Sequence, residues 1–349
     1  YAVQAAFSHD PAAPLPVIGE QPAGVDLHIT CPPGKAVRIF TGAPIPAGAD
    51  AVIMQEDVTR SGDLISCREP VQPGENIRRA GADLCPGQLM LRKGEKVTAG
   101  TIGLLASQGL TSLTIHASPR VAVLSTGDEL RAPGQPLEDG CIYNSNGPML
   151  HALLAELGID KIEAMHCADK LDATRDLLKD LIAGQDIVLL SGGVSVGDHD
   201  HIKPALAKLG IIPEIWRIKV RPGKPFLFAQ VHPEGHSRPV SIFGLPGNPV
   251  SAFVTFHLFV RPALLRWMGA ADHKPFHIPA RTATSLRNDG DRPHYLRGVL
   301  KNGLFHASQL QQSHALFALS QANALLRLEP GQTLKESEEA MVMPLKSPA

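Results

Sequence analysis

The sequence predicts a multidomain protein of mixed α/β and β class. Between residues 120 and 269, short buried strands alternate with helical patterns, which indicates a doubly wound, mostly parallel α/β sheet domain with right-handed crossovers. Before and after this stretch the apolar runs are short and are separated by Pro and Gly turns, which is typical of β structure. We therefore expect an N-terminal β domain (1–87), a connector (88–118), the α/β domain (119–269) and a small C-terminal β domain (270–349).

The composition indicates which partners and which cellular compartment to expect. The 349 residues carry 33 basic and 34 acidic side chains, for a net charge of −1, so we expect neither a nucleic-acid nor a membrane partner. The five cysteines form no C-x-x-C pair, which favours reduced thiols in a cytoplasmic protein. The most apolar stretch, 250–260, is too short to span a bilayer. Because the chain opens on Tyr1 rather than methionine, we expect a further segment to precede it.

In the first third of the chain, short strands are expected at 36–40, 51–56 and 64–67. A helix is expected to run to about residue 108, with Thr98 as its cap and Gly109 as its stop.

The α/β stretch is expected to contain strands at 121–124, 162–165, 187–190, 214–220, 226–229 and 240–243, and helices at 146–157, 172–182, 202–209 and 249–267. The helix from 146 has an Asn cap, and Pro249 suits the first turn of the last helix. Four strands of the C-terminal domain are expected at 277–282, 295–300, 325–328 and 340–343.

Loops rich in Gly or Pro follow several predicted strands of this sheet: STGDEL (125–130), SGGVSVGDHD (191–200), RPGKP (221–225) and GLPGNP (244–249). Any one of them could be an ordinary strand-to-helix turn. In open α/β sheets, however, ligands bind beyond the carboxyl ends of the strands, and glycines let a ligand approach the backbone closely. Together the loops predict a composite ligand site on one edge of the sheet.

Charged side chains in these loops suit a phosphate and a metal. The carboxylates of Asp128, Asp198 and Asp200 can hold Mg²⁺, which bridges phosphoryl oxygens. Arg221 and Lys224 supply positive charge for a second anion.

The segment Asn144-Ser145-Asn146 opens a predicted helix, where N–H groups and the helix dipole favour an anion. His199 and His201 flank Asp200, but alternating loop residues point in different directions, so histidine ligation of a metal is disfavoured.

As an ordered set these motifs resemble the molybdopterin molybdenumtransferase (MoeA) family, which includes the gephyrin E domain. The resemblance covers nearly the whole chain and also rests on segments outside the four loops: VRIFTGAPIP (37–46), DAVIMQED (50–57), NIRRAGAD (76–83) and Lys203. It implies a central domain of the molybdopterin-binding type. It also implies insertion of molybdate into adenylylated molybdopterin, with Mg²⁺-dependent cleavage of the adenylate and release of AMP. Such proteins are elongated homodimers that can meet other proteins of molybdenum-cofactor biosynthesis.

The resemblance also implies residue roles. Asp83, Asp128 and Asp200 would be catalytic, with Asp128 and Asp200 holding the metal, and Asp83 would reach the cleft of the partner subunit. Asp198 becomes secondary, because family members vary there. The substrate-binding residues would be Ser125, Thr126, Gly127, Asn144, Ser145, Asn146, Ser191, Gly192, Gly193, Lys203, Arg221, Lys224, Pro246, Gly247 and Asn248.

The chain departs from the family pattern at several positions. The family commonly has an acidic residue where Asn144 stands and a lysine where Arg221 stands, an acidic residue is often seen where Ala82 stands, and some members have a Glu within 98–100. Two other functions are open: adenylyl transfer to molybdopterin or a related nucleotide cleavage, and a non-catalytic scaffold like gephyrin. The flanking β domains disfavour the first. The joint presence of Asp83, Asp128, Asp200 and Lys203 disfavours the second.

Overall fold

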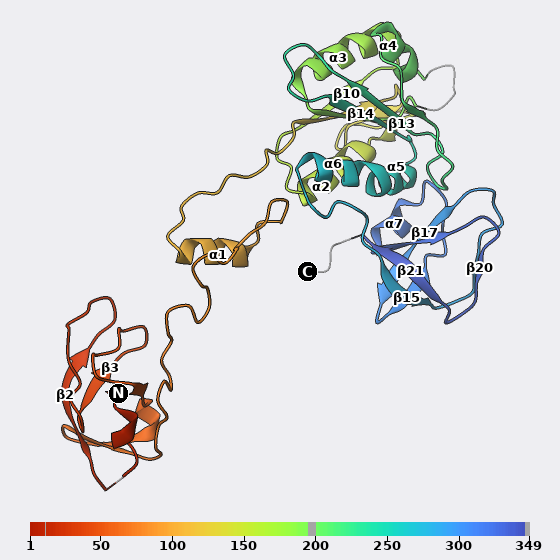
Figure 1. Ribbon diagram of the computed structural model, residues 1–349. Helices are drawn as coiled ribbons and strands as arrows, with labels where there is room; N and C mark the ends of the chain where they lie inside the picture. The colour runs from red at the N-terminus through yellow and green to blue at the C-terminus, as the bar shows by residue number, and fades with distance from the viewer. Residues whose placement is uncertain (11, 195–199, 346–349) are drawn as a thin grey trace. The chain divides into compact units, whose positions relative to one another are not determined.

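The computed structural model describes residues 1–10, 12–194 and 200–345 (Figure 1). The chain divides into two compact units, Tyr1–Leu89 and Met90–Ala349. Among the described residues, no helix combines the length and the apolar character needed to cross a membrane.

The first unit contains a six-stranded sheet in the order β4-β1-β3-β2-β6-β5. In chain order its elements are β1 (Ala2–Val3), η1 (Ala5–Phe7), β2 (Leu15–Gln21), β3 (Ala36–Ile39), β4 (Ala51–Val52), η2 (Gln55–Asp57), β5 (Val58–Ser61) and β6 (Leu64–Cys67). The strand expected at 51–56 is wrong beyond Val52, because the chain turns into the 3₁₀ helix η2. β1, β2 and β5 were not predicted.

The second unit begins with a connector that carries α1 (Ala99–Ser107). The Thr98 side chain caps this helix by accepting a hydrogen bond from the Thr101 N–H at 3.3 Å. Gly109 follows with φ +74°, a left-handed conformation that suits glycine at a helix end. The expected helix, its cap and its stop are confirmed.

The central sheet has the order β10-β7-β11-β14-β13-β12. β10, β7, β11 and β14 run parallel, whereas β13 is antiparallel to both β14 and β12. The predicted doubly wound, mostly parallel sheet is confirmed. Its strands are β7 (Val121–Thr126), β10 (Ile162–Cys167), β11 (Ile187–Ser191), β12 (Ile215–Trp216), β13 (Leu227–Val231) and β14 (Val240–Leu245).

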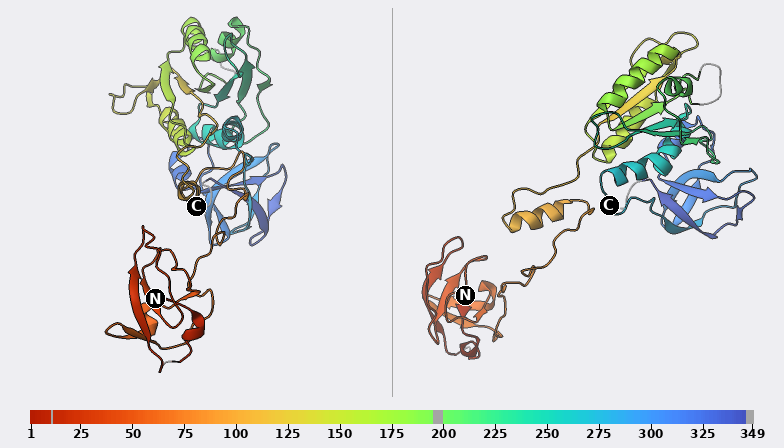
Figure 2. Two further views of the ribbon diagram at one scale, coloured as in Figure 1. Left: turned by 60° about the vertical axis from the view of Figure 1, so that its left-hand side comes forward. Right: turned by 45° about the horizontal axis from the view of Figure 1, so that its top comes forward.

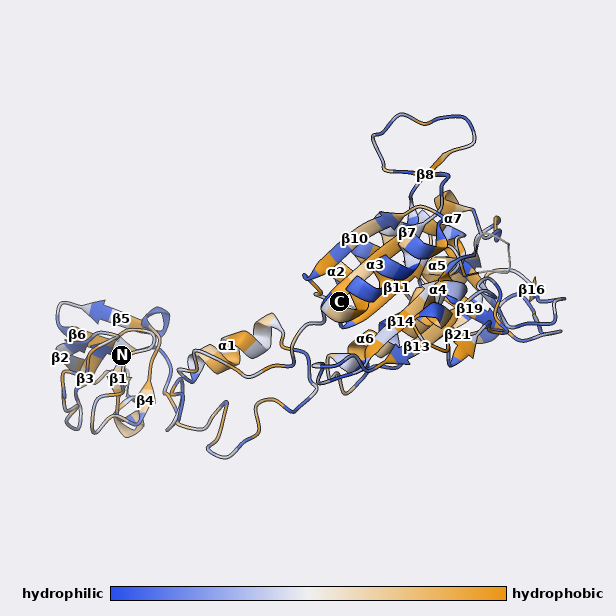
Figure 3. Ribbon diagram, turned by 90° about the horizontal axis from the view of Figure 1, so that it is seen from above, coloured by the Kyte–Doolittle hydropathy of each residue, from blue (hydrophilic) through white to orange (hydrophobic). Residues whose placement is uncertain are grey.

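Helices cover both faces of this sheet (Figure 2). On one face, α3 (Leu171–Gly184) and α4 (Ile202–Lys208) bury side chains such as Leu178 against β7 and β11. On the other, α2 (Asn146–Glu156) and the helix after β14 form a second core around Leu150. Successive strand residues point to opposite faces, so a strand between two helix layers must be apolar throughout. In Figure 3 the strands β7, β11 and β14 are coloured mainly as hydrophobic.

The long helix expected at 249–267 is present with an interruption. It consists of α5 (Pro249–Thr255), a π-helical turn η3 (Phe256–Val260) and α6 (Arg261–Trp267). Pro262 has no N–H to donate to the carbonyl four residues earlier, which accounts for a local widening of the helix at this point.

The strand expected at 214–220 is mostly wrong. Only β12 (Ile215–Trp216) forms, because Arg217 adopts φ +65° and turns the chain. The Ile218 N–H then donates to the Lys224 carbonyl at 3.1 Å, which closes the following loop on itself.

The C-terminal part forms a closed barrel in the order β15-β18-β17-β19-β21, with β16 and β20 paired beside it. Its elements are β15 (Ile278–Thr282), β16 (Leu286–Arg287), β17 (His294–Lys301), β18 (Leu304–Ala307), α7 (Leu316–Ser320), β19 (Ala324–Leu328), β20 (Thr333–Leu334) and β21 (Glu339–Pro344). The four predicted strands are confirmed, whereas β16, β18 and β20 were not predicted.

A carboxylate ties the starts of β7 and β11 together. Asp186 accepts hydrogen bonds from the Arg120 N–H at 2.8 Å and from its guanidinium at 3.3 Å. Burial by itself would raise the pKa of Asp186, but the Arg120 hydrogen bonds and charge outweigh it and lower the pKa below 3.8.

We expect Asp186→Asn to reduce the free energy of unfolding by about 1 kcal/mol at neutral pH. A lowered carboxyl pKa stabilises the fold above the unfolded-state pKa, and this stabilisation fades as pH falls through the folded-state pKa. The difference from wild type should therefore shrink below pH 3.8 in denaturant titrations. A difference that persisted unchanged in acid would contradict this assignment.

Candidate functional site

The structure brings the predicted loops to one edge of the central sheet. β7, β11 and β14 end in register, since Ser191 pairs with both Ser125 and Leu245. The turn between β12 and β13 reaches the same edge, because Leu227 at the start of β13 pairs with Gly244 near the end of β14. STGDEL, RPGKP, GLPGNP and the described part of the 191–200 loop are therefore neighbours, as expected for strand-end loops.

Glycines let two of these loops approach closely. A Cβ on Gly192 would lie 2.7 Å from the Thr126 carbonyl oxygen, and a Cβ on Gly193 would lie 2.9 Å from the Thr126 hydroxyl. Both glycines have positive φ, at +92° and +62°. Gly247 also packs near Gly192, at 3.8 Å from a Cβ on Gly247 to the Gly192 Cα. The edge is thus lined by backbone that only glycine permits.

The Asn146 amide joins two of the loops to the start of α2. Its Nδ2 donates to the Ser191 hydroxyl at 2.8 Å and to the Gly247 carbonyl at 2.7 Å. Asn146 is buried and is the first residue of α2, so it does not cap the helix as the sequence suggested. Ser145 occupies the N-cap position, and the Asn144 Oδ1 accepts the Gly147 N–H of the first turn at 2.9 Å.

Polar atoms at this edge are buried without a hydrogen-bond partner among the described residues: Ser125 Oγ, Thr126 Oγ1 and Asn146 Oδ1. A buried polar atom without a partner costs about 1–3 kcal/mol. Two of these groups can donate and all can accept hydrogen bonds, so a ligand with phosphoryl oxygens and polar ring atoms would satisfy them.

Asp128 lies beside a carboxylate that sequence reasoning missed. The Asp169 N–H donates to Asp128 Oδ1 at 3.0 Å, and the Asp128 N–H donates to Asp169 Oδ2 at 3.4 Å. The preceding residue is also held, since the His166 ring Nε2 lies 2.9 Å from the Gly127 carbonyl oxygen. Asp169 follows β10, so the same strand-end rule that selected the other loops could have found it.

The other acidic residues predicted for the site lie in different parts of the chain. Asp200 is half-buried and precedes α4. Asp83 belongs to the first unit, where it is exposed and follows a turn closed by the Ala82 N–H and the Arg79 carbonyl. Asp198 and His199 lie outside the described residues. Within the described ranges, no group of three or more His, Cys, Asp or Glu side chains is arranged to hold a metal ion.

The predicted cationic residues include two whose positions are supported by contacts with neighbouring elements. Lys203 lies in the first turn of α4, with its Nζ 4.8 Å from the centroid of the Trp216 ring. The Arg221 backbone is bound by the barrel, because its N–H donates to Pro293 O at 2.9 Å and its carbonyl accepts the Tyr295 N–H at 2.8 Å. Arg221 and Lys224 are both exposed at this edge.

A neutral histidine underlies this basic loop. Burial, followed by the charges of Arg221, Arg297 and Arg292, lowers the pKa of His294 to about 4. His294 is therefore uncharged near neutral pH and adds no positive charge beneath Arg221.

The rest of the predicted substrate-binding set also lies at the strand ends. Pro246 is buried between β14 and α5, whereas Asn248 is exposed directly before Pro249, and Ser145 is half-buried directly before α2.

Comparisons with known proteins find related sequences along most of the chain. Family models match the MoeA N-terminal region (domain I and II) at residues 1–109, a probable molybdopterin binding domain at 122–266 and the MoeA C-terminal region (domain IV) at 279–345. A molybdopterin molybdenumtransferase from Nostoc sp. is 36% identical over 99% of this chain and 81% of its own length. The chain belongs to the molybdopterin molybdenumtransferase family.

Other members of the family are similar over most of the chain. The molybdopterin molybdenumtransferase of Haemophilus influenzae is 38% identical over 90% of this chain and 78% of its own length. Among solved structures, a molybdopterin biosynthesis MoeA protein from Pyrococcus horikoshii has a TM-score of 0.76 at 31% identity, covering 99% of this chain and 86% of that one. The family and the multidomain fold predicted from the sequence are confirmed.

In this family member, we expect Asn146 and Ser191 to be energetically coupled. Asn146→Ala should lower the free energy of unfolding by about 1–3 kcal/mol, because it leaves buried groups unpaired. A double-mutant cycle with Ser191→Ala should give a coupling energy of about 0.5 kcal/mol or more in denaturant titrations. Strict additivity of the two substitutions would contradict the bridge.

Proposed function

We propose that this enzyme inserts molybdenum from molybdate into adenylylated molybdopterin, with Mg²⁺-dependent cleavage of the adenylate and release of AMP. The observation that carries the proposal is the edge of the central sheet. There, buried Ser125, Thr126 and Asn146 atoms that have no partner within the described part of the chain lie near the glycine backbone of Gly192 and Gly193. Curated relatives named molybdopterin molybdenumtransferase support the transfer of molybdenum to molybdopterin in this proposal.

The edge suits the phosphoryl part of such a substrate. The Ser125 and Thr126 hydroxyls can donate to phosphoryl oxygens, and the start of α2 adds the positive end of a helix dipole. Lys203 contributes an ammonium charge whose position is supported by the Trp216 ring. Together these groups provide hydrogen-bond donors and positive charge for an anion.

The carboxylates fit a magnesium ion that is completed by substrate. Mg²⁺ is usually bound through one or two carboxylates plus substrate phosphates and waters. Asp128 is exposed beside Asp169, and we propose that Asp128 and Asp200 hold the ion, with Asp169 keeping Asp128 in place through its N–H. The bound ion would neutralise charge on the phosphoanhydride as AMP leaves.

We assign the molybdate end of the site to the basic loop. Molybdate is a tetrahedral oxyanion, and a guanidinium fork can donate two parallel hydrogen bonds to it. The hydrogen bonds between the Arg221 backbone and the barrel fix the position of the Arg221 main chain. Lys224 adds a second positive charge. A homodimer in which Asp83 serves the partner's cleft stays a prediction, as does a cytoplasmic location.

The first test concerns the metal ligand. With the full-length chain, we expect AMP release from adenylylated molybdopterin to require both molybdate and Mg²⁺. Asp200→Asn should lower the turnover rate at least about tenfold, since loss of a charged ligand weakens both the ion and the transition state it stabilises. Asp160→Asn is the matched control, because Asp160 is exposed just before the opposite end of β10.

Intact adenylate after incubation of the wild-type chain with molybdate and Mg²⁺ would overturn the proposed reaction. Equal turnover of Asp200→Asn and wild type at limiting Mg²⁺ would instead overturn only the role of Asp200.

The second test concerns the oxyanion. Arg221→Ala should raise the molybdate concentration for half-maximal turnover about tenfold or more, which corresponds to about 1.4 kcal/mol. Arg221→Lys keeps the charge but not the planar fork, so we expect an intermediate effect. Lys179→Ala, an exposed cation on α3, should have no effect. Tungstate should compete with molybdate, and an unchanged molybdate requirement in Arg221→Ala would exclude this contact.

A further inference from the structure

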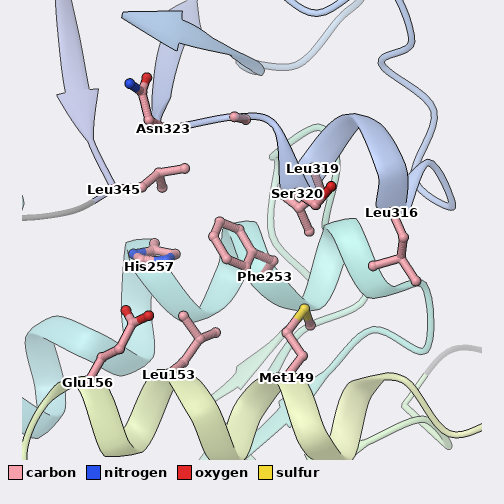
Figure 4. Close-up of a pocket in the computed structure, with 11 residues that line it drawn as sticks. Met149, Leu153, Glu156, Phe253, His257, Leu316, Leu319, Ser320, Asn323 and Leu345 are labelled. Atoms are coloured by element: carbon pink, nitrogen blue, oxygen red, sulfur yellow. The ribbon is translucent and has the colours of Figure 1, made fainter.

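A second pocket lies away from the strand ends, with a volume of about 300 Å³ (Figure 4). Its walls come from α2, from α5 and η3, from α7 and from the segment after β21. Glu156 in its wall is the last residue of α2, whereas Asn146 of the strand-end site is the first. At a rise of about 1.5 Å per residue, these ends of α2 are about 15 Å apart. The pocket is therefore distinct from the proposed active site.

The wall of this pocket is mainly apolar. Leu153 on α2, Phe253 on α5 and Leu319 on α7 face one another across it (Figure 4). Leu345 contributes from the end of the barrel. A volume of this size is at the lower end of the range for small-molecule sites, and such sites combine apolar walls with a few polar groups.

A buried histidine supplies one of those polar groups. His257 is 6% exposed, and its Nε2 is buried without a hydrogen-bond partner among the described residues. It lies in the π-helical turn η3, a feature often found at functional sites. Its ring packs against Phe253 at 4.5 Å between centroids. Burial, followed by the charge of Arg261, lowers the pKa of His257 to about 3, so the ring is neutral near pH 7.

The charged group of the pocket lies next to this histidine. Figure 4 shows the Glu156 carboxylate on the same side of the pocket as the His257 ring. A carboxylate in this place repels an anion that approaches Nε2, because two like charges are destabilising at short range. Arg261, whose charge also acts on His257, is not among the residues that line the pocket, whereas Glu156 is. The charge in the pocket wall therefore disfavours an anionic ligand.

We propose that this pocket is a second binding site, for a compact, largely apolar, uncharged molecule with one hydroxyl or N–H group that hydrogen-bonds to His257 Nε2. Apolar burial against Leu153, Phe253 and Leu319 supplies most of the binding free energy. The hydrogen bond satisfies an atom that has no other partner in the ranges that the structure describes, and Glu156 disfavours acidic relatives of the ligand.

A matched set of probes separates these contributions: 2-naphthol, naphthalene and 2-naphthoate. We expect 2-naphthol to bind the purified full chain saturably and one-to-one in a fluorescence titration. Naphthalene, which lacks the hydroxyl, should bind about fivefold more weakly, which corresponds to about 1 kcal/mol for one hydrogen bond. The anionic 2-naphthoate should bind more weakly still.

Variants assign each effect to a side chain. Leu153→Trp fills the cavity and should abolish binding of all three probes. His257→Phe should weaken 2-naphthol about fivefold and leave naphthalene unchanged. Glu156→Gln is at the rim, where it carries little risk to folding, and should strengthen binding of 2-naphthoate while 2-naphthol stays as in wild type. Thermal unfolding of each variant establishes that it is folded.

Absence of saturable 2-naphthol binding to the wild-type chain would overturn the proposal. This holds also if the cause is a second chain that covers the pocket. Equal affinity of wild type and Leu153→Trp would place the probe elsewhere and would also overturn it. Equal affinity of wild type for 2-naphthol and naphthalene would overturn the role of His257. None of these outcomes bears on AMP release at the strand-end site, which is measured without the probes.

Discussion

The Asn146 amide is the contact on which the candidate active site depends. Its two N–H groups bind the Ser191 hydroxyl and the Gly247 carbonyl, so the start of α2 is tied to the ends of β11 and β14. Its carbonyl oxygen is left buried and without a partner among the described residues. A single side chain thus ties two loops to the start of α2 and still offers an acceptor to a ligand, which is a preorganised arrangement.

The bridge is useful only because the sheet beneath it is rigid. Separate apolar cores on the two faces hold β7, β11 and β14 in register. The C-terminal part of the chain adds a further constraint, since Pro293, directly before β17, and Tyr295 within β17 bind the N–H and the carbonyl of Arg221. The basic loop of the α/β domain is therefore held in part by the barrel domain.

Charge is distributed so that the strand ends attract anions and the second pocket does not. Lys203, Arg221 and Lys224 are exposed near the strand ends, and the buried His294 beneath them is held neutral. His257 is also neutral, and it lies beside apolar side chains and the Glu156 carboxylate, with the charge of Arg261 also acting on it. The preference of the strand ends for anions therefore comes from the exposed cations and not from the buried histidine.

The amino-acid sequence by itself determined the strands and helices of the α/β domain, the strand-end loops and the family. These follow from local patterns: apolar runs, glycines, and caps such as Thr98. It did not show that Asp169 faces Asp128, nor that Asn144 rather than Asn146 accepts an N–H at the start of α2. It also predicted a strand at 214–220 where Arg217 turns the chain. The turn at Arg217 comes where the pairing of β12 with β13 ends, and the Arg217 N–H there donates to the Phe226 carbonyl at 2.8 Å. The other two points were decided by the tertiary structure, because the Asp128–Asp169 contact joins residues 41 positions apart and the Asn146 amide is taken by Ser191 and Gly247 from distant loops.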